Sequence, residues 1–383
     1  MQRVDPRPPV VVVDGDLLGH HVTGGEATTI AVRIARRLNR AFPQAQFVLA
    51  AGNEDSACGD YTLAPDSAFL RDVTAAWEPL VNRRGAAPAF RRTFAHDGFY
   101  TARLPLPGLT AIVIDDVYWS PVYHARCGSA VNGGAETLAE LTSALARTPG
   151  RVWLFFHIPP GIDTYTTALV THGTVIVPYL KPVMRDRFLT ALTSASGRIA
   201  LAVAGHTHKF AFRIAGPNGP RPVPMLLVPA LSPVYKNEPS FLTGEVAADG
   251  TLESVEEHSY RHGAWDAIGG SRTWGLAAFT GPQLVALQER LGREPQLRAT
   301  FARLYDGGAR PEITDRNWAI YWCAATAFST TTFRSCAQSG GVGIVTSRGV
   351  TGLLALAVPL AAVIAGLLWW RSSRRAGRSR RPG

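Results

Sequence analysis

Acidic, amide and imidazole side chains follow five apolar runs of the chain, at the point where each run ends. A short apolar run is typical of a buried parallel strand, and ligands of such sheets gather at the carboxyl ends of the strands. Each polar end alone is also consistent with an ordinary turn, but the repetition favours a shared site. The five ends are Asp14-Gly15-Asp16, Gly52-Asn53-Glu54-Asp55, Asp115-Asp116, His157 and Gly205-His206-Thr207-His208.

The side chains at four of these ends are of the kinds that bind divalent metals. Asp16 offers a carboxylate that can bridge two ions, Asn53 a neutral oxygen, and His157 and His206 ring nitrogens. Two divalent ions about 3.5–4 Å apart can clamp a phosphate ester and lower the pKa of the water between them, so that hydroxide attacks phosphorus. The residue types therefore predict metal-dependent phosphate chemistry.

The spacing of apolar residues predicts the elements that hold these ends in place. Strands alternate with helical periods in the first half of the chain, and short strands with Gly-Pro turns follow the histidine pair, including a hairpin around Asp249-Gly250. We therefore expect an α/β fold of two packed sheets flanked by helices. The helical periods lie at 26–42, 69–80, 135–147, 184–194 and, with a break at Pro295, 281–306.

Taken in order, these motifs resemble the calcineurin-like metallophosphoesterase superfamily. The resemblance covers roughly residues 8 to 340, and three motifs look like its acid sphingomyelinase-like branch: Gly-Asp-x-x-x-His at 15–20, His-Ile-Pro-Pro-Gly at 157–161 and the segment 232–241. It implies a two-sheet metallophosphoesterase sandwich. It also implies a phosphodiesterase that hydrolyses a phosphate ester of a lipid headgroup or a nucleotide.

The resemblance also implies a set of ligands for two divalent metal ions. One ion would be bound by Asp16, Asn53, His157 and His206, and the other by Asp16, His208 and an Asp-x-His pair on an earlier strand. No Asp-x-His precedes Asp16, so the second site is expected to be incomplete in this chain. Mixed nitrogen and oxygen ligands suit zinc, manganese or iron, and the sphingomyelinase-like branch points to zinc.

Other residues receive roles from the same resemblance. His20 corresponds to the histidine that protonates the leaving oxygen, with a surface histidine as the alternative reading, and Tyr235 and Asn237 are expected to line the substrate pocket. Glu54 departs from the family, which commonly has histidine there, and a carboxylate cannot donate a proton unless its pKa is raised. A protein that retains the fold on a membrane surface with impaired catalysis is therefore the alternative function.

The last part of the chain predicts a membrane anchor. Residues 349–370 carry no charge and end in two tryptophans, and a basic tail at 371–383 holds six arginines, leaving +4 of the net charge of +10 for the rest. This pattern predicts a single transmembrane helix with an extracytoplasmic catalytic domain and a cytoplasmic tail, although a buried core helix is the alternative. Because the arginines lie beyond that segment, nucleic acid is not expected as a specific partner.

The remaining predictions concern domain limits and cysteines. We expect a metallophosphoesterase domain at 8–260 and a helical carboxyl-terminal subdomain at 261–340. The domain is expected to lack its first strand, since neither a signal peptide nor Asp-x-His precedes residue 16. An extracytoplasmic compartment permits disulfides, and proximity in sequence and at the strand ends favours Cys58 with Cys127 and Cys323 with Cys336; free buried cysteines are the alternative.

Overall fold

A six-stranded sheet forms the centre of the computed structural model, which describes residues 1–124, 133–309 and 311–339. Its middle strands β4, β5, β6 and β8 are parallel, and the edge strands β3 and β7 run antiparallel to their neighbours. The carboxyl ends of the four middle strands therefore meet at one edge of the sheet. The strands are, in spatial order, β3 (Tyr100–Arg103), β4 (Leu109–Val113), β5 (Arg151–Phe156), β6 (Ile199–Ala204), β8 (Val223–Leu227) and β7 (Ala211–Ala215).

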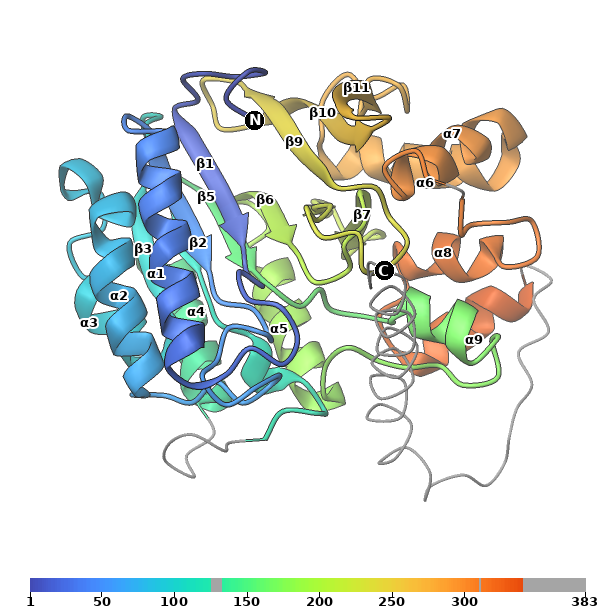
Figure 1. Cartoon of the computed structure of the whole chain (residues 1–383). Helices are drawn as coiled ribbons and strands as arrows, with labels where there is room; N and C mark the ends of the chain where they lie inside the picture. The colour runs from blue at the N-terminus through green and yellow to red at the C-terminus, as the bar shows by residue number, and fades with distance from the viewer. Residues whose placement is uncertain (125–132, 310, 340–383) are drawn as a thin grey trace, which may run out of the picture.

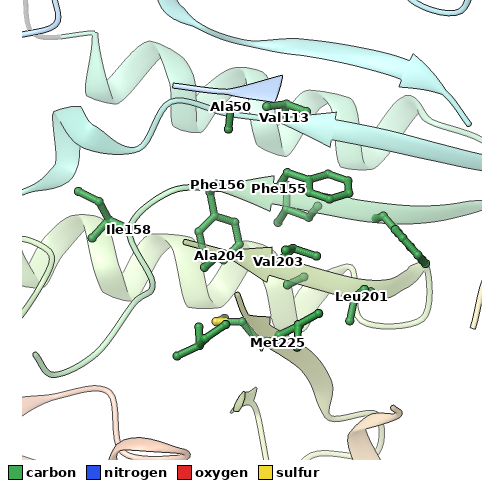
Figure 2. Packing of buried hydrophobic residues seen from close by; sticks show 14 of the residues in the cluster. Ala50, Val113, Phe155, Phe156, Ile158, Leu201, Val203, Ala204 and Met225 are labelled. Atoms are coloured by element: carbon green, nitrogen blue, oxygen red, sulfur yellow. The ribbon is translucent and has the colours of Figure 1, made fainter. Parts of the chain in front are cut away.

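The core of the molecule lies on both faces of this sheet. Every residue of β6 and all but the first residue of β5 are buried, so these strands read as continuous apolar runs in the sequence. Figure 2 shows the packing of Phe155, Phe156, Val203 and Met225 within this layer. Close packing on both faces fixes the strand ends, and with them the polar residues that follow.

Helices cover the sheet on two sides. Figure 1 shows α1 (Gly24–Ala41), α2 (Ala68–Val81) and α3 (Phe90–Asp97) gathered on one side of the molecule, and α6 to α9 on the opposite side. The ranges of α1 and α2 and of α4 and α5 match the helical periods of the sequence, and α3 is an additional helix. The others are α4 (Gly134–Arg147), α5 (Pro182–Ser194), α6 (Gly281–Arg293), α7 (Pro295–Tyr305), α8 (Trp318–Ala324) and α9 (Thr330–Ser339), with short turns at Arg83–Gly85, Val117–Trp119 and Thr166–Val170.

The expected two-sheet arrangement is corrected by the strand pairing. Within the described residues the strands form three hydrogen-bonded sheets, because β1 (Val10–Asp14) pairs only with β2 (Gln46–Ala50), and β9 (Ser240–Val246) pairs only with β10 (Leu252–Arg261). The third strand of the latter sheet, β11 (Ala264–Gly270), lies in a range that was expected to be helical. Apolar patterns indicate strands but not which strands pair, which is why the sequence suggested two sheets.

The predicted membrane helix is a second correction. Across 1–124, 133–309 and 311–339, every helix is too short or too polar to cross a bilayer. The longest of them, α1, has 18 residues but carries several arginines. The predicted span at 349–370 and the tail at 371–383 lie outside the described residues. The described residues therefore give no support to the transmembrane part of the predicted fold, or to the single-pass membrane location that depends on it.

Candidate metal centre

Four predicted ligands meet at the carboxyl edge of the strands. Nε2 of His157 lies 3.0 Å from Oδ2 of Asp16 and 3.1 Å from Oδ1 of Asn53, and Nδ1 of His206 lies 2.7 Å from the same amide oxygen. Asp16, His157 and His206 each offer a ligand atom within 4.8 Å of the others. Side chains from the segments that follow β1, β2, β5 and β6 thus converge on one point, although up to 190 residues separate them along the chain.

The backbone around these ligands is unusually tight. A side chain at Gly52 would overlap the Asp16 carboxylate, and one at Gly15, where φ is 88°, would overlap the His157 ring. Asp16 and His206 themselves adopt left-handed conformations, with φ of 52° and 62°. Residues other than glycine rarely adopt such angles, and strained positions of this kind cluster at functional sites. The sharp turns direct the ligand side chains back toward one another.

Hydrogen bonds outside the centre set the orientation of His157. Its Nδ1 donates to the backbone oxygen of Asp14 at 2.7 Å, which directs Nε2 toward the other ligands. The Asp116 carboxylate accepts from the backbone N–H groups of His157 and Ile158, at 3.2 and 3.0 Å. A histidine that ligates a metal usually donates its second ring nitrogen to a carbonyl or carboxylate in this way.

The charges of the centre suit a cation. Burial opposes ionisation of Asp16, but the adjacent His157 and His206 rings hold the pKa of its carboxyl below the usual range. Burial also lowers the pKa of His206 to about 3, so its ring is neutral and can offer a lone pair. Although burial disfavours its charged form, the pKa of His157 rises to about 10 because of the Asp16 carboxylate. A metal ion would replace the proton that this pair holds, so the residues present fit a divalent metal.

His208 lies beside this cluster rather than within it. Its ring contacts Tyr235 edge to face at 4.8 Å between ring centres, and its buried Nδ1 has no hydrogen-bond partner among the described residues. Burial lowers the pKa of His208 to about 4, which keeps the ring neutral. Its role as a ligand of a second ion, and the role of Tyr235 as a substrate contact, stay predictions.

Asn237 lies in the loop between β8 and β9, and its side chain is buried. Its Nδ2 donates to the backbone oxygen of Ser232 at 3.0 Å and of Glu238 at 3.2 Å, so this nitrogen holds the loop that carries Tyr235. The Asn237 Oδ1 atom has no partner within the described part of the chain. Its predicted contact with substrate is untested.

His20 lies in a second cluster next to the metal ligands. Its Nδ1 is 2.8 Å from Oε1 of Glu54 and 3.0 Å from Oδ2 of Asp60, and its side chain is 41% exposed. The sequence did not single out Asp60, because it occurs in a polar loop rather than directly after an apolar run. The turn-forming Cys58-Gly59-Asp60-Tyr61, a few residues beyond Asn53, was the available signal.

One predicted disulfide is confirmed. Cys323 and Cys336 are bonded and join α8 to α9. Cys58 also takes part in a disulfide, but Cys127 lies outside the described residues, so the pairing of these two residues stays a prediction.

Comparison with known proteins shows that the chain is similar to metallophosphoesterase-like phosphodiesterases, the class that the motifs indicate. The chain is 26% identical over 259 residues to Sphingomyelinase phosphodiesterase D of Dictyostelium discoideum, and the match covers 63% of this chain and 53% of the relative. The chain thus spans about half the length of that curated relative. The resemblance drawn from the motifs is confirmed by this match.

Other comparisons are weaker. No family model matches the chain. GAP50, described as the anchor in the inner membrane complex of Plasmodium, is 9% identical with a TM-score of 0.37, and covers 77% of this chain and 95% of its own. A 5'-nucleotidase from Staphylococcus aureus is 12% identical with a TM-score of 0.31, and the match covers 73% of this chain and 49% of that protein.

Proposed function

We propose that the protein is a metal-dependent phosphodiesterase of the acid sphingomyelinase-like type, which hydrolyses a phosphate ester of a lipid headgroup or a nucleotide. The observation that carries this proposal is the convergence of Asp16, Asn53, His157 and His206 from four strand ends. The similarity to a sphingomyelinase phosphodiesterase supports the reaction class.

The four ligands would hold one divalent ion through a carboxylate, an amide oxygen and two imidazoles. This donor set suits zinc, with manganese or iron as alternatives. When bound, such an ion neutralises phosphate charge and lowers the pKa of water. His208 would be a ligand of a second ion.

The protein's own groups would orient and protonate the substrate. His20 is half-exposed beside the proposed metal ligands, where it can reach a phosphate ester that enters from solvent and give a proton to the leaving oxygen. The rings of Tyr61 and Tyr179 contact His206 edge to face, at 6.3 and 5.2 Å between centres, and they restrict water on that side of the ligands.

Loss of a ligand tests this proposal. His206→Ala and Asn53→Ala are each expected to weaken metal binding by at least about 100-fold and to abolish hydrolysis of bis-4-nitrophenyl phosphate. Metal content is measured by mass spectrometry and hydrolysis with and without a chelator. His96→Ala is the matched control, because His96 is an exposed histidine paired with Asp66 instead.

Two results would contradict the proposal. Full metal content and full rate in either ligand variant would remove these residues from the centre. A metal-loaded wild-type protein that hydrolyses no phosphodiester would support the alternative of a retained fold with impaired catalysis.

A further inference from the structure

Two carboxylates converge on one nitrogen of His20. Oε1 of Glu54 lies 2.8 Å and Oδ2 of Asp60 lies 3.0 Å from Nδ1 of the ring. Neither carboxylate belongs to the proposed ligand set. Glu54 also stands where the family commonly has a histidine.

We propose that Asp60, together with Glu54, is a positioning residue that fixes the hydrogen of His20 on Nδ1 and so leaves Nε2 to protonate the leaving oxygen. This inference rests on the proposed function, since it assigns a device to the same site. It gives Glu54 a role as a hydrogen-bond acceptor, which an oxygen of its carboxyl group can perform.

Asp60 is the main partner of the two, because its contact with Nδ1 has the geometry of a hydrogen bond, although the Glu54 oxygen lies slightly nearer. The Glu54 side chain also accepts from Nδ2 of Asn53 at 2.9 Å, and its backbone N–H donates to Asp16 at 2.9 Å, so Glu54 is tied to the ligands. The Asp60 side chain contacts His20 and Glu54. Asp60 is held in place because the next residue, Tyr61, donates its backbone N–H to the backbone oxygen of Asn53 at 2.8 Å.

The surrounding charges agree with an acidic role for the ring. Hydrogen bonds to Asp60 first and Glu54 second raise the pKa of His20 to about 10, although partial burial acts in the opposite direction. The other titratable groups in range are His208, across the site, and His21, which faces Asp60. The ring is therefore an imidazolium near neutral pH and carries a proton to donate.

The hydrolysis step is balanced as follows. A water oxygen forms the new bond to phosphorus, and the ester P–O bond breaks with its electron pair on the leaving oxygen. The proton on Nε2 of His20 passes to that oxygen, and the proton lost by the water restores the imidazolium. During this transfer Asp60 and Glu54 keep the hydrogen on Nδ1, and the Asp60 carboxylate stabilises the charge of the ring.

The first arm of the test is independent of catalysis. In metal-free protein, the pKa of His20 is followed by nuclear magnetic resonance, with His20→Gln used to assign its signal. Asp60→Asn is expected to lower this pKa by about one to three units, and Asp60→Glu to retain most of it. An unchanged His20 pKa in Asp60→Asn overturns the proposal; should that variant not fold, Glu54→Gln is the replacement, expected to lower the His20 pKa by a smaller amount.

Asp66→Asn is the matched control. Asp66 pairs with Nδ1 of His96 at 2.9 Å, the same kind of contact, and this pair raises the pKa of His96. The control is expected to lower the pKa of His96 and to leave that of His20 unchanged. A comparable fall for His20 in this control would show a general effect of charge and would overturn the proposal.

The second arm compares leaving groups. Diphenyl phosphate releases a much more basic oxygen than bis-4-nitrophenyl phosphate and needs the acid more. Asp60→Asn and His20→Gln are expected to lower the rate ratio of diphenyl to bis-nitrophenyl ester by about 10- to 100-fold. Equal losses on both esters overturn the proposal. If the wild-type protein hydrolyses neither ester, the proposed function fails, and the resonance arm still decides the positioning role.

Discussion

Replacing Lys209 with methionine is expected to destabilise the protein strongly. Lys209 directly follows His208 and is 1% exposed, and its ammonium lies 2.5 Å from Oδ1 of Asp306 and 2.9 Å from Oε2 of Glu312. It also donates to the backbone oxygen of Tyr235 at 3.0 Å. Removing one partner of a buried pair leaves an uncompensated charge and costs about 3–5 kcal/mol. Here two carboxylates lose their cation, so the upper part of that range is expected for the loss in unfolding free energy.

The loss in unfolding free energy caused by Lys209→Met should depend on pH in a defined direction. Burial already raises the pKa of Asp306 and of Glu312, while Lys209 acts to lower both. Without Lys209 these pKa values rise further, so the native state binds protons more readily than the unfolded state above the ordinary carboxyl value of about 4. Stability of Lys209→Met therefore falls as the pH rises through that window, and the difference from wild type is smaller at pH 5 than at pH 8.

Urea denaturation followed by tryptophan fluorescence measures both effects. Arg272→Met is the control, because Arg272 belongs to an exposed ion pair with Glu245 at 3.7 Å, for which less than about 1 kcal/mol is expected. The reasoning is refuted if Lys209→Met loses no more than this control, or if its loss is the same at both pH values.

Two further changes test stability elsewhere. Glu257 is fully buried, and burial raises its pKa to about 8. Between about pH 4.5 and pH 8 the native state therefore keeps Glu257 protonated while the unfolded state loses this proton, so this residue makes stability decline as the pH rises. Glu257→Gln should remove that decline, which is measured by denaturation across the range. An unchanged decline contradicts this. The double variant Cys323→Ser/Cys336→Ser should lose about 3 kcal/mol, because the bond closes a loop of 13 residues; equal denaturation midpoints with and without the bond would refute that value.

Local sequence patterns predicted the elements better than their assembly. The ranges of α1, α2 and α4 follow from apolar spacing, and the continuous apolar runs mark β5 and β6, because both faces of these strands are buried. Strand pairing depends on contacts between distant segments, so the separate sheet of β9 to β11 could not be derived from spacing. Strand β11 itself is mostly exposed and lacks the apolar signal.

The residues of the candidate site also divide into those that local sequence patterns predicted and those that they did not. Asp16, Asn53, His157 and His206 were recognisable because each lies within three residues of the carboxyl end of an apolar strand. Asp60 and Lys209 were not, since their importance arises from partners far away or in a loop: Asp60 contacts His20, and Lys209 contacts Asp306. A polar residue whose partner is distant in sequence carries no local signature.

The left-handed backbone of Asp16, His206 and His208 sets function against stability. These residues have φ of 52°, 62° and 60°, where glycine is strain-free and other residues cost about 1 kcal/mol or more. A change of His206 to glycine would therefore relieve this backbone strain while it removes a ligand. Mutations that relax the backbone at these positions thus lead away from the metal centre, and only selection for an activity that uses the ligands opposes them.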